Sequence, residues 1–387
     1  MKNFVFHNPT KILFGKDTIP SIGSETAAFG KKALMVYGQG SIKKNGIHGQ
    51  VTKSLHEAGV TIIEHGGVRS NPVLSHVHKG IALARESKVD VIVAVGGGSV
   101  IDSAKAIAAG TLVEHDVWKF FIGKKSIKKT LPLTCVLTLA ASGSEMNSGM
   151  VVTNESTKQK FGFANKHLYP KISILDPTAT FSVSPEYTAY GAVDAIAHIL
   201  EYYFTNQEPY TPVQDHFMEG LVISCMDSCN RVLQNLEDYD ARADLMWAAT
   251  LALNGLTAAG LGKAGFPMHM IEHSISALYN AAHGAGLSVV IPGWMVYQSQ
   301  RTPEKFARFG ERVFGITAGG MEKKAAAGIQ ALLSWFVNVK SPTSLTALHI
   351  SGQDIPLIAE NAVALAKIWG MTDYTEEKIE EILKLCV

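Results

Sequence analysis

The spacing of hydrophobic residues changes near residue 182. Before that point, short runs of β-branched and apolar residues alternate with segments of helical periodicity. We expect strands within 31–38, 60–67, 89–96, 131–139 and 171–175, a hairpin around 157–163, and helices within 49–59, 73–87 and 99–110. This alternation is typical of a parallel sheet whose strands are joined by crossover helices. Val91 to Val95 carry no polar residue on either face, which predicts a central strand covered on both sides.

Beyond LDPT at 175–178 the apolar residues recur with helical period almost to the end of the chain. The expected helices lie within 190–203, 215–233, 242–256, 267–279, 306–314, 324–339, 355–369 and 376–385. Ser184 followed by Pro185 suits the N-cap and first turn of the opening helix. We therefore predict an α/β Rossmann-like domain over residues 1–182 and an all-α domain over residues 183–387.

Composition excludes several classes of protein. The 387 residues, 47% of them hydrophobic, are enough to fill two cores, and 35 basic against 34 acidic residues leave a formal charge of +1. No nucleic-acid or membrane partner is expected from this charge. The start of the chain lacks the apolar core of a signal peptide, and the four cysteines form no CxxC pair. These features predict a cytoplasmic enzyme.

Four residues of the second half have the spacing of metal ligands. Asp194 and His198 are separated by one helical turn, so they can present an oxygen and a nitrogen to one ion, and His269 with His283 can complete the site. These could also be ordinary polar positions on amphipathic helices. However, Asp194 and His198 have Ala, Ile and Leu as neighbours, and a carboxylate is costly in such company unless something pairs it. Three imidazoles and one carboxylate favour a divalent metal, with iron, zinc, cobalt or manganese all acceptable.

Two glycine loops follow predicted strands. Gly96 to Gly98 and Ser99 open a helix, where backbone N–H groups and the helix dipole can bind a diphosphate. Residues 38–41, Gly-Gln-Gly-Ser, contain no acidic side chain for a ribose hydroxyl, and Lys43 and Lys44 follow them. This favours NADP, or the use of both NADP and NAD, although the loop could also be a solvated turn.

With these motifs in place, the chain resembles the iron-containing (group III) alcohol dehydrogenases, in particular their butanol dehydrogenase and broad aldehyde reductase branch. The resemblance extends from NPTKILFGK through YGQGSIKKNG, VGGGSVIDSAKAIAAG and LYPKISILDPT to AHGAGLSVVIPGWM. It implies the two-domain fold shared with dehydroquinate synthases, a homodimer, and interconversion of small aldehydes and alcohols such as butanal and butanol.

The resemblance also implies roles for single residues. Asp194, His198, His269 and His283 would bind the metal, and His273 would lie beside it and relay a proton. The cofactor-binding residues would be Gly38, Ser41, Asn71, Gly97, Gly98, Ser99, Asp102, Thr138, Ser142 and Lys160. Gln39 departs from the run of glycines common in close relatives, so the resemblance does not fix how the adenosine ribose is bound.

Three alternatives remain at this point. A glycerol or other polyol dehydrogenase and a cyclising lyase share the two-domain plan, but a lyase for an anionic sugar acid needs several Arg and Lys, whereas the segments ILEYYF, LALNGL and GFPMHMI near the ligands are mostly apolar. A metal-dependent hydrolase would need no nucleotide, and its glycine loops would be purely structural. Binding of NADPH separates the hydrolase from the dehydrogenase.

Overall fold

The chain forms two compact units, and the computed structural model describes all of residues 1–387. An α/β unit contains residues 7–183 and 236–250. A helical unit contains residues 1–6, 184–235 and 251–387. A single boundary at residue 182 would therefore assign two short segments, 1–6 and 236–250, to the wrong unit.

Specific hydrogen bonds account for both segments. The backbone N–H of Lys2 donates to the carbonyl oxygen of Gly260 at 2.9 Å, which holds the first residues on the helical unit. The Thr250 hydroxyl donates to a carboxylate oxygen of Glu145 at 2.6 Å, which holds the second segment on the α/β unit.

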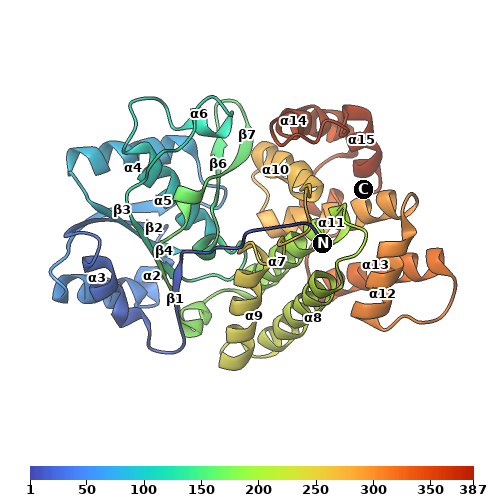
Figure 1. The fold of residues 1–387 in the computed structure, drawn as a ribbon, viewed down its shortest axis with the longest axis horizontal. Coiled ribbons are helices and arrows are strands. Elements are labelled where there is room, and N and C mark those ends of the chain that lie inside the picture. Colours follow the sequence, from blue (N-terminus) through green and yellow to red (C-terminus); the bar gives the residue numbers. More distant parts are fainter. The chain divides into compact units, whose positions relative to one another are not determined.

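The α/β unit is built on one six-stranded sheet in which all strands are parallel (Figure 1). Its order is β1-β8-β5-β4-β2-β3. The strands are β1 (Lys11–Phe14), β2 (Lys32–Gly38), β3 (Thr61–Val68), β4 (Val91–Gly96), β5 (Leu133–Leu137) and β8 (Ile172–Leu175). A separate antiparallel hairpin pairs β6 (Gly149–Asn154) with β7 (Gln159–Ala164).

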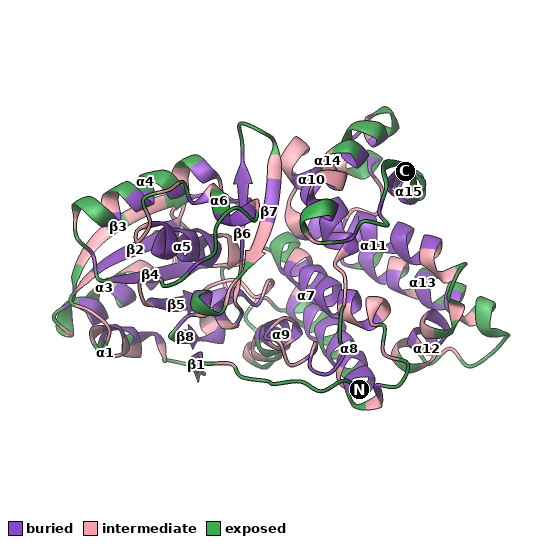
Figure 2. Ribbon diagram, turned by 45° about the horizontal axis from the view of Figure 1, so that its top comes forward, coloured by how far each residue is buried: buried purple, intermediate pink, exposed green.

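Helices cover both faces of this sheet because its strands are apolar on both sides. Every residue of β4 is buried, as the sequence predicted, and the same strand is purple in Figure 2. Met35 and Val93, which are register partners, belong to a core cluster with Val51 and Leu55 of α3 (Ile47–Glu57). Helix α5 (Gly98–Gly110) packs against β4, and α4 (Leu74–Glu86) packs against α5. The remaining helices of this unit are α1 (Ile22–Ala27), α2 (Ser41–Lys44) and α6 (Trp118–Phe121).

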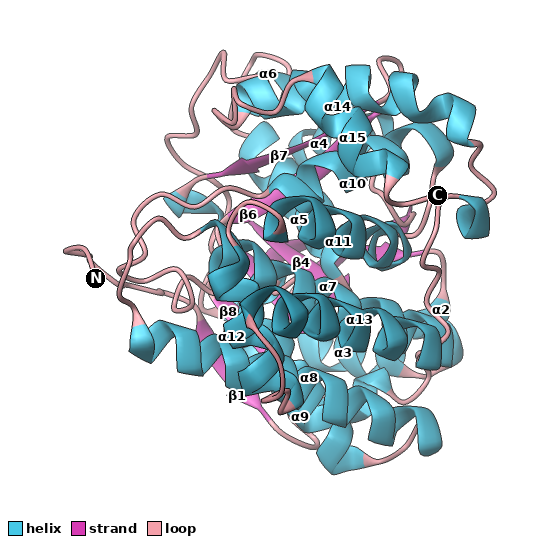
Figure 3. Cartoon of the chain, turned by 90° about the vertical axis from the view of Figure 1, so that its right-hand side faces the viewer, coloured by secondary structure: helices cyan, strands magenta, loops and turns pink.

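The helical unit contains no strand, and Figure 3 shows strands only among the elements of the α/β unit. Its helices are α7 (Pro185–Thr205), α8 (Pro212–Gln234), α10 (Pro267–Tyr279), α11 (His283–Ser299), α12 (Pro303–Phe314), α13 (Met321–Asn338), α14 (Ile355–Ile368) and α15 (Glu376–Lys384), while most of α9 (Tyr239–Ala252) belongs to the α/β unit. The predicted cap is confirmed, because the Ser184 hydroxyl accepts the N–H of Tyr187 and Pro185 is the first helical residue. None of these helices is long and apolar enough to cross a membrane.

Several elements were not predicted. The helices α1, α2 and α6 have only four to six residues, too few to show a helical period. Strand β1 has only four residues and lies at the edge of the sheet beyond β8, so its sequence has little of the burial pattern that marks a strand. Helix α11 is apolar on nearly all sides and contains Pro292, so it lacks the one-sided periodicity on which the other helices were recognised. Its first residue is His283, so the missed helix positions one of the candidate ligands.

Candidate metal centre and nucleotide-binding loops

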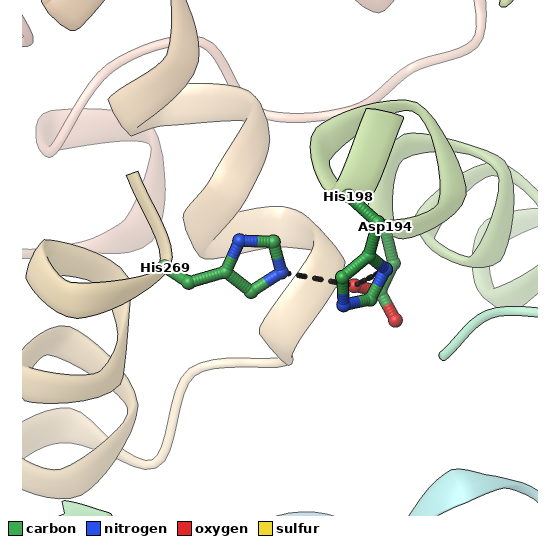
Figure 4. Close-up of side chains that lie close together, drawn as sticks. All are labelled: Asp194, His198 and His269. Carbon is green, nitrogen blue, oxygen red and sulfur yellow. Dashed lines mark ion pairs between the residues drawn. The ribbon is translucent and has the colours of Figure 1, made fainter. Parts of the chain in front are cut away.

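Helix α7 presents a carboxylate and an imidazole on one face. Asp194 and His198 lie one turn apart and are both buried, among alanine, isoleucine and leucine side chains that are also buried. Nδ1 of His198 lies 3.5 Å from Oδ1 of Asp194 (Figure 4). This separation is longer than a hydrogen bond between these atoms, so the two groups are close without being bonded to each other.

Two further imidazoles converge on the same carboxylate oxygen. Nε2 of His269, from α10, lies 3.6 Å from Oδ1 of Asp194, and Nε2 of His283, from the start of α11, lies 3.5 Å from it. Four ligands at about 2.1 Å from a tetrahedral ion would be separated by about 3.4 Å. The three measured distances are therefore those expected between ligands of one ion.

Three of these buried atoms have no hydrogen-bond partner: Oδ1 of Asp194, Nδ1 of His198 and Nε2 of His269. Burial by itself raises the pKa of Asp194, but the surrounding imidazoles, His198 first, hold it well below its ordinary value. Burial lowers the pKa of His198 to about 3. The cluster therefore contains an ionised carboxylate and a neutral imidazole that lack hydrogen bonds, which is the state in which both bind metal.

Glu201 lies behind His269. This carboxylate is fully buried on α7, and one of its oxygens, Oε1, accepts the backbone N–H of His269 at 2.8 Å and lies 3.1 Å from its Nδ1. Burial by itself lowers the pKa of His269, but Asp194 and Glu201 raise it to about 9. An ion that displaces the proton from Nε2 would leave the Nδ1 proton on the Glu201 side and the lone pair of Nε2 directed to the cluster. Glu201 was missed from the sequence, although it follows Asp194 by seven residues and His198 by three, on the same helical face.

Glu272 has the same relation to His283. It is fully buried on α10, one carboxylate oxygen contacts Nδ1 of His283, and the other accepts the Ser276 hydroxyl. Sequence reasoning also missed this residue, because it lies directly before His273 and nothing in the pattern shows which side chain turns toward His283.

His273 is buried on α10, one turn after His269. Its ring centroid lies 5.5 Å from that of His283 and 5.5 Å from the ring of Trp369. It is not among the residues paired with Asp194. His273 thus lies beside the cluster and next to the Trp369 ring.

The first glycine loop joins β4 to α5. Gly96 ends the strand, Gly97 is the N-cap, and Gly98 and Ser99 are the first helical residues. A Cβ atom on Gly98 would lie 2.2 Å from the hydroxyl oxygen of Ser142. A larger residue at this position would therefore displace the Ser142 side chain. The backbone N–H of Thr138, just after β5, donates to the carbonyl oxygen of Gly96 at 3.1 Å.

Asp102 braces a neighbouring loop. Its Oδ1 accepts the Ser144 hydroxyl at 2.6 Å, and its Oδ2 accepts the backbone N–H of Val151 at 3.0 Å. The fully buried Lys105 ammonium contacts the Ser144 hydroxyl, the carbonyl and side-chain oxygens of Asn147, and the Gly149 carbonyl. This internal network ties the loop after Ser142 to helix α5.

The other proposed cofactor residues fall into two groups. The Lys160 ammonium, on β7, donates to the side-chain oxygen of Asn71 at 2.9 Å, and both side chains are buried. Gly38 ends β2, and the exposed Ser41 begins α2. All of these residues belong to the α/β unit, whereas the metal cluster belongs to the helical unit.

The chain has a parallel α/β unit with glycine loops and a helical unit with a cluster of three histidines and one aspartate. These features place it in the class of two-domain proteins whose helical domain can bind a metal ion. Residues 9–177 match the family model for iron-containing alcohol dehydrogenase, and residues 188–387 match the model for the C-terminal part of that family. The chain belongs to the iron-containing alcohol dehydrogenase family, as its motifs had indicated.

Similar proteins extend over the whole chain. The sequence is 39% identical over 386 residues to a probable NADH-dependent butanol dehydrogenase 1 of Bacillus subtilis, with 99% of each chain covered. It is 37% identical over 361 residues to the NADPH-dependent aldehyde reductase YqhD of Escherichia coli, with 92% of each covered. The crystal structure of an NADH-dependent butanol dehydrogenase A from Thermotoga maritima matches with a TM-score of 0.96 and 46% identity, covering 100% of this chain and 99% of the other. This similarity confirms the predicted fold class.

Proposed function

We propose that this protein is a metal-dependent, NAD(P)H-linked alcohol dehydrogenase that interconverts small aliphatic aldehydes and primary alcohols such as butanal and butanol. The observation that carries the proposal is the convergence of His198, His269 and His283 on one oxygen of Asp194, at 3.5, 3.6 and 3.5 Å. The relatives named for NADH- or NADPH-dependent reactions of alcohols and aldehydes support it.

The residues fit a divalent ion. Asp194, His198, His269 and His283 would hold it, and the buried atoms without hydrogen bonds on the first three are the atoms that it would satisfy. With three nitrogens and one oxygen from the protein, a substrate oxygen could bind if the ion expands its coordination from four to five, as catalytic sites can. When bound, the ion would supply a Lewis acid for the carbonyl group and the nicotinamide would supply the hydride.

The protein's own residues supply orientation and proton transfer. Glu201 and Glu272 fix the tautomers of His269 and His283, so that Nε2 of each faces Asp194. The apolar rings near the cluster, Phe266 beside His269 and Trp369 beside His273, favour a substrate without charge. We assign His273 the exchange of the alcohol proton with solvent, because it lies beside the cluster and is not needed as a ligand when the other four residues bind the ion.

The diphosphate of the cofactor would lie on Gly97, Gly98 and Ser99, at the start of α5. Gly38, Ser41, Asn71, Thr138, Ser142 and Lys160 would complete the cofactor site. Asp102 would support the cofactor site indirectly, by accepting a hydrogen bond from the Ser144 hydroxyl. Both NADH and NADPH occur in the names of similar proteins, so both cofactors are to be tested.

The decisive experiment combines metal analysis with butanal-dependent oxidation of NADH and NADPH. His283→Ala should lose both the metal and aldehyde reduction, whereas His273→Gln should retain the metal and lose turnover. His216→Ala, an exposed histidine on α8, is the matched control and should behave as wild type. Full activity in a metal-free His283→Ala protein would refute the metal role, and glycerol as a substrate in place of butanal would favour the polyol alternative.

A homodimer and a cytoplasmic location belong to the same proposal. Phe4, Val5 and Phe6 expose 53%, 94% and 44% of their surfaces near the start of the chain, which suits an interface between two copies. All four cysteines are buried thiols, which suits a reducing compartment.

A further inference from the structure

Four side chains flank the loop of residues 38–41. Tyr37 precedes the loop on β2, Lys43 follows it on α2, His48 lies on α3 and Glu64 lies on β3. Glu64 is the centre of this group. Its Oε2 accepts the Tyr37 hydroxyl at 2.6 Å and lies 3.3 Å from the Lys43 ammonium, and its Oε1 lies 3.2 Å from Nε2 of His48.

These contacts fix the position and the charge of Glu64. The Tyr37 ring is buried in the core between β2 and α3, so its hydroxyl is held at one place. The hydrogen bond from Tyr37 lowers the pKa of Glu64, followed by smaller effects of Lys43 and His48. Glu64 is therefore an anchored carboxylate at neutral pH.

The positive charge of Lys43 is compensated by Glu64. Its ammonium is paired with Glu64 and lies 5.0 Å from the centroid of the Tyr37 ring. The sequence suggested that Lys43 and Lys44 would offer two positive charges to a phosphate beside Ser41. The structure compensates the charge of Lys43 with an acidic residue from a different strand, which the loop sequence could not reveal.

The consequence concerns cofactor choice, and it rests on the proposed use of a nicotinamide cofactor. NADP differs from NAD by a 2′-phosphate on the adenosine ribose, so the net charge around the ribose pocket decides between them. We propose that Glu64 is a specificity-determining residue, which disfavours the 2′-phosphate of NADPH by holding and neutralising Lys43. The residue acts through Lys43 rather than by touching the reacting atoms.

The test measures the ratio of kcat/KM for NADPH to that for NADH, with butanal as substrate. Glu64→Gln keeps the shape of the side chain and removes its charge, so Lys43 becomes available and the ratio should rise roughly two- to fivefold at low ionic strength, and less at high salt. In Glu64→Gln combined with Lys43→Met the ratio should return to the wild-type value. Glu57→Gln is the matched control, because Glu57 is an exposed glutamate of α3 that pairs with Lys53 instead.

A binding measurement separates this inference from the proposed function. The affinity for adenosine 2′,5′-bisphosphate relative to adenosine 5′-monophosphate, measured by calorimetry, should rise in Glu64→Gln by the same factor and needs no hydride transfer. A wild-type protein that reduces butanal with neither cofactor would count against the proposed function, whereas an affinity ratio unchanged in Glu64→Gln would count against the role of Glu64.

Two further outcomes would overturn the inference. One is a gain in NADPH preference that survives the loss of Lys43 in the double variant. The other outcome comes from a single variant that can be measured even if Glu64→Gln is too unstable for kinetics. In Lys43→Met the ratio of NADPH to NADH efficiency should be nearly unchanged. A large loss of NADPH use in this variant would show that Lys43 already binds the 2′-phosphate and would overturn the inference.

Discussion

Glu201 and Glu272 illustrate how single buried carboxylates orient the candidate metal ligands. Each is fully buried, and each contacts Nδ1 of a different candidate ligand, His269 or His283. Burial raises the pKa of Glu201, and its contacts with His269 oppose that rise. A carboxylate in this position raises the basicity of the imidazole and fixes the ring for its ligand role.

We expect Glu201→Gln and Glu272→Gln each to weaken metal retention by roughly 10- to 100-fold, because the charge behind the imidazole is lost while the ligand itself remains. The measurement is the rate of metal release to a chelator, together with the visible spectrum of the cobalt-loaded protein. Glu360→Gln, at an exposed position of α14, serves as the control. Retention equal to wild type in both variants would show that the two carboxylates do not support the ligands.

At the scale of elements, helix α5 and the loop after β5 form one unit of structure through Lys105. Its ammonium is fully buried and has four oxygen neighbours, at 2.9, 3.0, 3.0 and 2.7 Å. Burial lowers the pKa of Lys105 to about 8, with Asp102 opposing the shift. The helix that begins with the proposed diphosphate loop is thus joined to the loop that carries Ser142.

Lys105→Met should lower the free energy of unfolding by about 2 to 4 kcal/mol, because it leaves the buried oxygens of Asn147 and Gly149 without the ammonium that donates to them. Denaturant unfolding followed by circular dichroism measures this change, and Lys53→Met, at an exposed position of α3, should change little. The same variant should weaken cofactor binding more than metal retention. A loss of less than about 1 kcal/mol would contradict this role.

The elements also show what can be read from a sequence. Helix α10 was predicted with its observed bounds, because apolar residues follow the helical period from Pro267 to Tyr279. Helix α11 was not predicted, because apolar residues on all sides give no period. The candidate ligands were indicated by their spacing and by the apolar neighbours of Asp194 and His198. In contrast, Glu64, Glu201 and Glu272 act through contacts between different elements of the folded chain, which residue spacing does not encode.

At the scale of the whole molecule, metal binding should contribute to stability, since a cluster drawn from α7, α10 and α11 exists only in the folded helical unit. An ion present at about 100 times its Kd would stabilise the protein by about 2.7 kcal/mol. Treatment with a chelator should therefore lower the melting temperature by roughly 2 to 5 °C, and returning the metal should restore it. His283→Ala should not respond to the chelator. A wild-type melting temperature independent of metal would contradict a bound ion.

The division of the chain has a consequence for its synthesis. The α/β unit needs residues 236–250, and the first six residues belong with a helical unit that continues to residue 387. On the ribosome, the sheet strands are complete by residue 175, yet the segment that finishes their unit follows only after α7 and α8 have been made. At about 5 to 20 residues per second, the nascent chain waits several seconds between the end of the sheet and that segment. During that interval the apolar faces of α7 and α8 have no finished core to pack against. We therefore expect the growing chain to depend most on binding by chaperones in this period.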